Sequence, residues 1–487
     1  MLKRIIGRKK EIKVLDRIWS SNEAEFLAIY GRRRVGKTHL IREYFCEKEI
    51  YFELTGIKDA SLANQLENFA SSFSKTFYPE IEVSTPPSWQ KAFGMLTNEL
   101  EKIAKNKKII LFFDELPWLA SRKSGFTQAL DHFWNTQWSR LSNLKLIVCG
   151  SAASWMLDHL INAKGGLYNR ITQQVQLTPF SLNETKVFLQ SRKINLANKL
   201  ILDLYMVLGG IPHYLKQIQK GKSAVQNIND ICFNRDGLLY GEFPRLIKSL
   251  FEESSLDEKI LRNIAKNRNG ISRKELLKEI GKTSGGRFGK RLEELEAAGF
   301  IQGFTPYGKK KKDRFYRIVD EYTLFYIDWI EPFVKKGKAF TNNSYWESKF
   351  GTPSWRAWAG FAFEGVCYSH VTQIRKALKL DKISCETGAW RYVPKKRSKE
   401  KGAQIDLLFD RDDDVISICE IKYSKNQFAI DKPYSQNLIN KIATFEKYFA
   451  SSKHHSFVMI TTMGVKRNVW SEDLVEAEVT LEDLFKP

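Results

Sequence analysis

The sequence has few cysteines and no long hydrophobic run. Its six cysteines lie far apart and no two form a C-x-x-C pair, which argues against a disulfide framework and a zinc site. No apolar segment is long enough to span a bilayer, and no signal peptide is recognisable. There is also no repeat of fixed period and no low-complexity tail. We therefore expect a cytoplasmic protein with reduced thiols and no membrane partner.

Acidic residues are too few to balance the basic ones. The 487 residues include 78 lysines and arginines against 56 aspartates and glutamates, so the formal net charge is +22. Such an excess indicates a polyanionic partner, most simply nucleic acid, although an ordinary basic protein can share it. The hydrophobic content of 43% is ample for packed cores, and the length predicts roughly three or four domains.

A phosphate-loop pattern, G-x-x-x-x-G-K-S/T, lies near the start of the chain. Residues 31–38 match it at every fixed position, between an apolar run expected to be a strand (25–30) and a segment expected to be a helix (39–45). Glycines let successive N–H groups turn toward a phosphate, and the helix adds its positive end. We expect this loop to bind ATP and Mg²⁺, with the lysine on the outer phosphates and the threonine on the metal. The predicted binding residues are Gly31, Val35, Gly36, Lys37 and Thr38.

Two acids follow the next buried strand. Five consecutive apolar residues, 109–113, precede Asp114 and Glu115. A parallel sheet places its ligand crevice at this strand end. We expect Asp114 to hold Mg²⁺ and Glu115 to orient and deprotonate the attacking water.

Two further residues are candidates for sensing or stabilising the γ-phosphate. A third buried strand, 144–150, ends at Ser151, whose polar side chain could sense the phosphate. Downstream, Arg170 follows the glycine-containing segment 165–169 and could stabilise transition-state charge. A solvent-exposed loop arginine is an equally good interpretation of Arg170.

Several motifs together resemble a known family. Residues 31–38, the 113–115 strand end, the 149–155 strand end and the 209–214 Gly-Gly-Ile-Pro-x-Tyr turn resemble the archaeal-type ATPases, in the STAND-like branch of the AAA+ NTPases. The 7–11 Gly-Arg-x-x-Glu motif is also similar to the opening of such ATPases. The resemblance implies a downstream winged helix, a C-terminal domain like restriction endonucleases, and an oligomeric regulator, here a homo-oligomer.

Residues 255–320 carry the pattern of a winged helix. Three helical segments are followed by a hairpin at 300–304 and 314–318, and the second helix opens with a capping box at Ser272 and Glu275. Basic side chains lie on the third helix and the hairpin turn, where such modules contact the phosphates of double-stranded DNA. They are Arg287, Lys290, Arg291 and the four lysines 309–312. A module that contacts only protein remains the alternative. The aromatic stretch 322–330 is expected to be a helix in the core.

The C-terminal region holds a second candidate site. Glu364 lies among apolar residues of a predicted helix, where a carboxylate needs a partner or a metal. A predicted hairpin carries Asp406 on one strand (402–410) and Glu420 and Lys422 on the other (415–423), the last two on one face. Acids that hold Mg²⁺ beside a lysine suit phosphodiester cleavage. Lys441, on a later helix, could face this site, but a solvated helix lysine is the preferred interpretation.

This arrangement resembles the D…E-x-K core of the PD-(D/E)xK nucleases, and Glu364 matches the acid that many members carry on their first helix. Ile405, rather than proline, precedes Asp406. The resemblance implies metal binding by Glu364, Asp406 and Glu420, and catalysis by Asp406, Glu420 and Lys422. Such domains can also lose cleavage and keep binding.

These observations predict an α/β multidomain protein. We expect a P-loop ATPase domain (1–180), a helical lid (181–250), a winged helix (251–325) and a nuclease-like α/β domain (326–487). The predicted function is an ATP-dependent switch that binds DNA and cleaves it with Mg²⁺. Two alternatives remain open: an ATP-responsive DNA-binding regulator without cleavage activity, and a switch that acts only on proteins.

Overall fold

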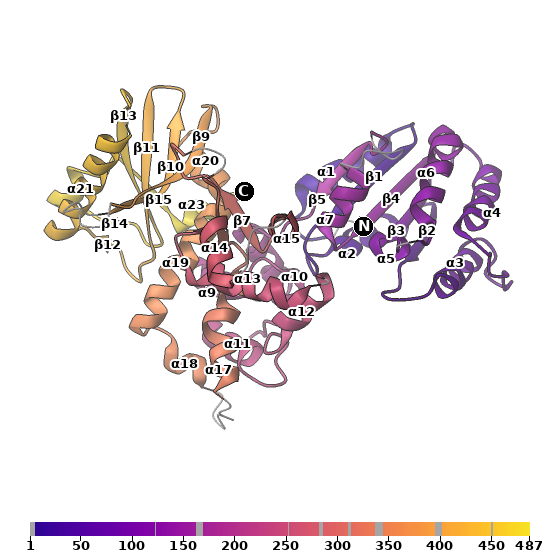
Figure 1. The fold of residues 1–487 in the computed structure, drawn as a ribbon, viewed down its shortest axis with the longest axis horizontal. Helices are drawn as coiled ribbons and strands as arrows, with labels where there is room; N and C mark the ends of the chain where they lie inside the picture. Colours follow the sequence, from indigo (N-terminus) through magenta and orange to yellow (C-terminus); the bar gives the residue numbers. More distant parts are fainter. Residues whose placement is uncertain are drawn as a thin grey trace. The chain divides into compact units, whose positions relative to one another are not determined.

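The chain folds into two compact units, Met1–Pro179 and Phe180–Pro487 (Figure 1). The structure is a computed structural model. It describes residues 5–121, 123–161, 169–251, 253–281, 286–309, 313–336, 344–394, 402–449 and 451–487. Within these residues no helix is both long and apolar enough to span a membrane.

The first unit is built on a five-stranded parallel sheet with the strand order β2-β3-β4-β1-β5. Every residue of β3 and β4 is buried, as their continuous apolar runs require of strands covered on both faces. The fold class is therefore α/β, with a parallel sheet typical of P-loop ATPases. The strands are β1 (Glu25–Tyr30), β2 (Ile50–Thr55), β3 (Ile109–Asp114), β4 (Leu144–Gly150) and β5 (Gln173–Gln176).

Helices pack on this sheet around an aromatic core. Phe93 of α4 stacks on Phe113 of β3 with 5.7 Å between ring centroids, and the buried Trp138 donates from Nε1 to Thr97 Oγ1 at 2.8 Å. The core thus holds the strand that ends at Asp114 in place. The helices are α1 (Lys9–Ser20), α2 (Lys37–Phe45), α3 (Leu62–Phe77), α4 (Trp89–Lys102), α5 (Leu116–Leu119), α6 (Phe126–Thr136), η2 (Trp138–Arg140), α7 (Ala153–Met156) and η3 (Leu157–Ile161).

The second unit opens with a helical layer. Ser181 and Glu184 form a capping box at the start of α8. The Gly-Gly turn then passes close to this point, because a Cβ on Gly210 would lie only 1.8 Å from the Phe180 carbonyl oxygen. The helices are α8 (Leu182–Ser191), α9 (Asn198–Leu208), α10 (Pro212–Leu215), α11 (Ala224–Cys232) and α12 (Glu242–Leu250).

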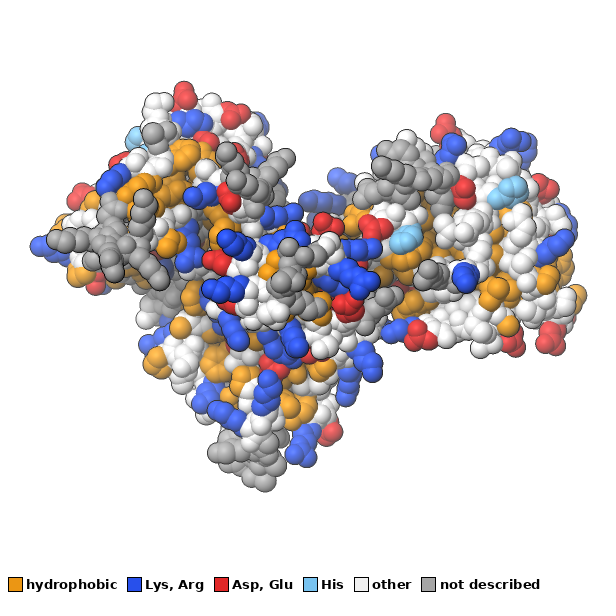
Figure 2. Space-filling view, viewed as in Figure 1, with side chains coloured by type: hydrophobic (Ala, Val, Ile, Leu, Met, Phe, Trp, Pro, Cys, Tyr) orange, Lys and Arg blue, Asp and Glu red, His pale blue; other side chains and the backbone are white. Residues whose placement is uncertain are grey.

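A small three-stranded antiparallel sheet follows, with the order β6-β8-β7. The capping box that the sequence predicts at Ser272 and Glu275 is confirmed at the start of α14. Figure 2 shows Lys and Arg side chains gathered over this region. Its elements are α13 (Ser254–Lys266), β6 (Ile271–Ser272), α14 (Arg273–Ile280), α15 (Gly286–Ala297), β7 (Ile301–Phe304) and β8 (Phe315–Ile318).

The aromatic stretch 322–330 is helical and mostly buried, as expected from its composition. The stretch lies within two consecutive helices, α16 and η5, which precede the last sheet in the chain. The elements of this connection are α16 (Glu321–Phe325), η5 (Tyr326–Ile330), α17 (Glu331–Lys335) and α18 (Tyr345–Lys349).

A mixed five-stranded sheet, ordered β15-β13-β11-β10-β9, forms the last part of the second unit. Its predicted hairpin is confirmed, since β10 and β11 pair antiparallel. Apolar residues of β10 and β11 share a core with α21. The strands are β9 (Cys385–Tyr392), β10 (Ala403–Arg411), β11 (Val415–Lys422), β12 (Phe428–Ala429), β13 (His454–Thr461), β14 (Val465–Lys466) and β15 (Ala477–Thr480). The helices are α19 (Pro353–Ser369), α20 (Val371–Ala377), α21 (Lys432–Tyr448), α22 (Val469–Glu472) and α23 (Leu481–Leu484).

Candidate functional site

The phosphate loop connects β1 to α2, as the sequence predicts. Three of its residues have a positive φ: Gly31 at 140°, Arg34 at 72° and Gly36 at 96°. Gly31 also lacks room for a side chain, because a Cβ there would lie 2.3 Å from the Leu177 carbonyl oxygen. The glycines of the pattern are therefore required by the path of the backbone.

Lys37 and Thr38 bring the loop together with the end of β3. The buried ammonium group of Lys37 donates to the carbonyls of Gly31 at 2.9 Å and Arg32 at 3.0 Å. Thr38 Oγ1 donates to Asp114 Oδ2 at 2.7 Å. Burial raises the pKa of Asp114, against the hydrogen bond from Thr38, which lowers it. A hydroxyl and a carboxylate side by side are the oxygen ligands that Mg²⁺ prefers, so the residues fit this ion.

Glu115 faces the end of the neighbouring strand, β4. It leaves β3 with a positive φ of 48°. Its carboxylate accepts from Ser151 twice, from Oγ at 2.7 Å and from the backbone N–H at 3.2 Å. The structure thus brings Glu115 and Ser151 together, and a phosphate that contacted Ser151 would also influence the carboxylate.

Arg170 lies on the surface just before β5. Residues 165–168 of the glycine-containing segment expected to position it lie outside the described residues. Among the described residues, Arg170 has no hydrogen bond or ion pair to the phosphate loop. Its predicted role therefore stays a prediction.

Arg8 is a residue of this site to which the sequence analysis assigned no role. Its guanidinium is 4% exposed and donates to two carbonyls, that of Val35 in the phosphate loop at 2.9 Å and that of Thr178 at 2.6 Å. The Gly-Arg-x-x-Glu motif thus fastens the start of the chain to the loop. The motif could be recognised in the sequence, but the contact of Arg8 with Thr178 could not, because the two residues are 170 positions apart.

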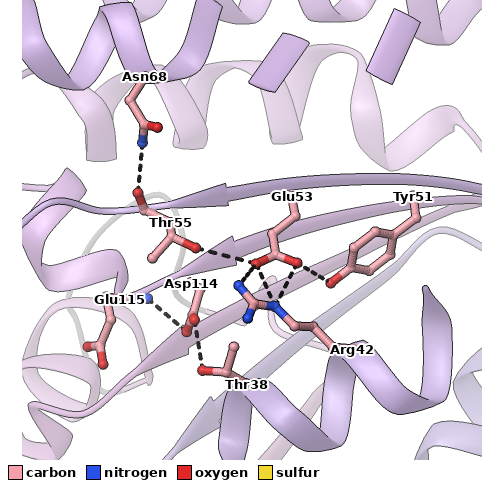
Figure 3. A network of polar contacts seen from close by, with 8 residues as sticks. All are labelled: Thr38, Arg42, Tyr51, Glu53, Thr55, Asn68, Asp114 and Glu115. Atoms are coloured by element: carbon pink, nitrogen blue, oxygen red, sulfur yellow. Dashed lines mark hydrogen bonds and ion pairs between the residues drawn. The ribbon is translucent and has the colours of Figure 1, made fainter. Parts of the chain in front are cut away.

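A further group of polar contacts lies beside the Thr38–Asp114 pair, between α2 and β2 (Figure 3). Arg42, one helical turn beyond Thr38, donates from Nε to Glu53 Oε1 at 2.9 Å. The hydroxyl of Tyr51 donates to the same carboxylate at 2.7 Å. These contacts tie the helix of the phosphate loop to the neighbouring strand, and Glu53 was not identified from the sequence.

The second site is centred on Glu420 in β11. Its Oε1 lies 2.9 Å from Lys422 Nζ and accepts from the hydroxyl of Tyr434 at 2.9 Å. Its Oε2 accepts from Lys441 Nζ. Burial opposes ionisation of Glu420, but the charges of Lys422 and Lys441 outweigh it, so the pKa lies below its usual value.

Lys441 corrects an interpretation made from the sequence. It is not a solvated helix lysine, because its ammonium group forms an ion pair with the buried Glu420. Tyr434, seven residues earlier on α21, was missed altogether. Helical spacing could have located both, since 434, 438, 441 and 445 lie on one face, and Leu438 and Phe445 on it are buried in the core.

Asp406 and Glu364 lie near this centre. Asp406 Oδ2 accepts from the backbone N–H of Ile421 at 3.3 Å. Burial, with the negative charge of Glu420, raises the pKa of Asp406 to about 6. Burial, with the charge of Asp406, raises the pKa of Glu364 to about 8. The negative charges of the three acids repel one another, and this repulsion adds to burial in raising the pKa of Asp406 and Glu364.

The chemistry of these donors suits Mg²⁺, yet their arrangement is not that of a formed metal site. Within the described residues, no three His, Cys, Asp or Glu side chains are grouped so that they could hold a metal ion. Both oxygens of Glu420 already accept hydrogen bonds. A metal would need these side chains to rearrange.

Of the predicted DNA-contacting residues, the structure places some on the surface and one inside. Arg287 and Lys290 of α15 are exposed. Arg291 instead pairs with Glu294 at 2.8 Å and with the buried Asp257 at 3.6 Å. Lys309 is also exposed, whereas lysines 310–312 lie outside the described residues.

Residues 5–218 match a family described as an ATPase domain predominantly from Archaea. This part of the chain is similar to that family, and we refer to it as the ATPase domain. It contains the parallel sheet, the phosphate loop and the helices α8 to α10. An uncharacterized protein of Methanocaldococcus jannaschii is 28% identical over 469 residues, 91% of this chain and 94% of that protein. An uncharacterized ATP-binding protein of the same organism is 47% identical over 45 residues, 9% of this chain and 76% of that protein.

Several solved structures are similar to this chain. A Walker-type ATPase of Pyrococcus abyssi has 21% identity and a TM-score of 0.47, over 66% of this chain and 96% of its own. The ORC2 protein of Aeropyrum pernix, in ADPNP and ADP complexes, has 15% identity and a TM-score of 0.41, over 69% and 96%. A STAND protein of Pyrococcus horikoshii has 18% identity and a TM-score of 0.30, over 78% and 53%.

Proposed function

We propose that this protein is an ATP-dependent switch that binds double-stranded DNA and cleaves it in its C-terminal domain. The observation that carries the nucleotide part is the contact between Thr38 and Asp114, which unites the phosphate loop with the acidic end of β3. The observation that carries the nuclease part is the ion pair of Glu420 with Lys422, next to Asp406, which accepts from the backbone N–H of Ile421.

In the ATPase domain, the chain's own residues supply most of what phosphoryl transfer needs. The N–H groups of the loop and the start of α2 would bind the phosphates, and Lys37 would exchange its carbonyl partners for phosphate oxygens. Thr38 and Asp114 would hold Mg²⁺, which neutralises charge between the outer phosphates. Glu115, oriented by Ser151, would accept a proton from the attacking water.

DNA binding is proposed for the segment from α13 to β8. Its order of three helices followed by a hairpin that completes a three-stranded antiparallel sheet resembles a winged helix and supports this proposal. Its exposed basic side chains would contact phosphates and confer affinity rather than sequence choice. They include Arg273, Lys274, Lys278, Arg287 and Lys290.

Cleavage is proposed for the sheet that contains β10 and β11. Glu364, Asp406 and Glu420 would hold Mg²⁺, which would activate water and neutralise the scissile phosphate. Lys422 would stabilise the negative charge that builds up on the phosphate as the P–O bond breaks. The positions of Asp406 on β10 and of Glu420 and Lys422 on β11 resemble those of a PD-(D/E)xK core and support this proposal.

One observation favours a second candidate, a DNA-binding regulator without cleavage activity. The two lysines on Glu420 supply positive charge where a nuclease would hold its metal. In that case the winged-helix segment would be the effector, and the C-terminal sheet would serve binding only.

Plasmid cleavage distinguishes these functions. The full chain and its Glu420→Gln variant would be incubated with plasmid, ATP and Mg²⁺ or Mn²⁺, with gel retardation of a labelled duplex in parallel. We expect the wild type to nick or linearise the plasmid, and Glu420→Gln to retard DNA without cleaving it. Retardation by both proteins without cleavage under any condition would reject the nuclease and leave the regulator.

The family resemblance further supports a homo-oligomer. Its mass would be measured by light scattering with ATP, with ADP and without nucleotide. A mass of one chain in all three states would contradict this part of the proposal.

A further inference from the structure

The ion pair between Lys441 and Glu420 is a contact that the proposed chemistry does not use. Lys441 lies on α21, and it reaches an acid on β11 that is 21 residues earlier in the chain. Its side chain is 15% exposed, and that of Glu420 is 4% exposed. A pair with this degree of burial is held in place by the packing of α21 on the sheet and is not a mobile surface contact.

The two oxygens of Glu420 have different partners. Oε1 is held by Tyr434 and by Lys422, the residue two positions further along the same strand. Oε2 is held by Lys441, which comes from another element. A cation that approaches Glu420 through Oε2 therefore displaces Lys441 and leaves the contacts of Lys422 and Tyr434 intact.

The charge around Glu420 also opposes the binding of a cation in the absence of DNA. Two ammonium groups already compensate the negative charge of Glu420, and both act to lower its pKa. A divalent cation that approaches Glu420 would meet these two ammonium groups, so we expect its affinity in the absence of DNA to be low. A phosphodiester brings negative charge, and the long stem of a lysine lets its ammonium group move from a carboxylate to a phosphate.

We infer that Lys441 is a positioning residue that makes metal binding depend on DNA. Without DNA, Lys441 occupies Glu420 and keeps the divalent cation out. With DNA, its ammonium group pairs with a phosphate and Glu420 becomes available to the metal. This inference rests on the proposed nuclease site, and it adds that the site holds its metal only when substrate is present.

The test is the affinity for Mn²⁺, measured from the electron paramagnetic resonance signal of the free ion. All proteins are full-length, nucleotide-free and carry Asp114→Asn, which removes the acid of the ATP site. Without DNA, Lys441→Met should bind Mn²⁺ at least tenfold more tightly than the parent. Lys441→Arg keeps the charge and should match the parent, and so should Lys447→Met, an exposed lysine of the same helix.

The same titration is repeated with a hydrolysis-resistant phosphorothioate duplex. DNA should tighten Mn²⁺ binding at least tenfold in the parent, and by a smaller factor in Lys441→Met. Equal Mn²⁺ affinity of parent and Lys441→Met without DNA, with binding abolished by Glu420→Gln, would overturn the role of Lys441 and leave the metal site standing. Absence of any binding that depends on Glu420, in every variant and with DNA, would reject the metal site and this inference with it.

Discussion

At the scale of single residues, the pair formed by Glu115 and Ser151 is central to the ATPase domain. The carboxylate accepts two hydrogen bonds from Ser151 and stands one residue beyond Asp114. A group that accepts a proton from water must be held in place, and the two hydrogen bonds from Ser151 fix the position of this carboxylate. We therefore propose Glu115 as the base for ATP hydrolysis and Ser151 as the residue that orients it.

The Glu115→Gln variant should bind ATP as the wild type does, with hydrolysis reduced roughly 10²- to 10⁴-fold because the proton acceptor is lost. Binding would be measured with a fluorescent ATP analogue, and hydrolysis by phosphate release. Ser151→Ala should reduce hydrolysis by a smaller factor. Full hydrolysis by Glu115→Gln would show that another group is the base.

His370 predicts a pH dependence of stability. It is buried between α8 and α19, where Nε2 accepts from the backbone N–H of Leu182 at 3.0 Å and Nδ1 contacts the Val366 carbonyl at 2.8 Å. Burial lowers the pKa of His370 to about 4, from roughly 6.5 when unfolded. The neutral ring therefore stabilises the fold above the unfolded pKa, and this stabilisation is lost as the pH falls from about 6.5 toward 4.

Between pH 7.5 and pH 5, this residue should contribute a loss of about 2 kcal/mol in unfolding free energy. The His370→Gln variant has no ring to protonate, so its stability should fall by about that much less than the wild type over the same range. Denaturant unfolding of both full-length proteins at the two pH values measures the difference. Parallel pH profiles would show that His370 does not titrate in this way.

Residues differ in how far the sequence alone could locate them. Lys37, Thr38 and Asp114 are predictable because each belongs to a short pattern whose spacing reflects local geometry. Arg8 is not, because its partner Thr178 is brought near only by the tertiary fold. For Lys441, helical spacing indicates the face that it shares with Leu438 and Phe445, but it does not identify Glu420 as the partner.

At the scale of elements, the Gly-Gly turn after α9 fixes the start of α8. The N–H of Phe180 donates to the Gly210 carbonyl at 2.7 Å, and the backbones approach too closely for any side chain at position 210. A tight backbone contact of this kind accepts no Cβ unless the chain moves.

The Gly210→Ala variant should therefore be destabilised by about 2 kcal/mol or more, because a buried overlap of this size forces a backbone shift. Gly360→Ala is the matched control, since a Cβ there meets nothing within 4 Å and alanine favours a helix interior. It should be neutral or stabilising. The two melting temperatures, measured by calorimetry, check this, and equal values would contradict the packing described for the turn.

The helices α14 and α15 carry the basic side chains proposed to contact DNA. Arg287→Gln combined with Lys290→Gln should weaken binding of unrelated duplexes by a similar factor, because phosphate contacts carry no sequence information. The slope of log affinity against log salt should fall by about two. Arg291→Gln should disturb stability instead, because Arg291 is paired inside the protein. An unchanged salt slope in the double variant would show that Arg287 and Lys290 do not contact DNA phosphates.

Elements were predicted with uneven success, for physical reasons. The strands 25–30, 109–113 and 144–150 and the hairpin of β10 and β11 were predictable, since buried strands need continuous apolar runs. The order of the strands was not, because β1 lies between β4 and β5, and such neighbours are chosen by the packing of the whole sheet. Lys441 was misjudged because it occupies a core-facing position of α21 that is otherwise apolar.

At the scale of the whole molecule, the chain combines an ATPase domain with a C-terminal sheet that gathers acids and lysines. The excess of basic residues, a net charge of +22, is in keeping with a polyanionic partner. The central claim is that ATP bound at the phosphate loop controls cleavage at Asp406, Glu420 and Lys422.

That claim is tested most directly by the rate of plasmid cleavage with and without ATP, for the wild type and for Lys37→Ala in the same buffer with Mg²⁺. We expect ATP to raise the cleavage rate of the wild type at least tenfold. With or without ATP, Lys37→Ala should cleave only as fast as the wild type does without ATP. Cleavage by Lys37→Ala as fast as that of the wild type with ATP would contradict control by the phosphate loop.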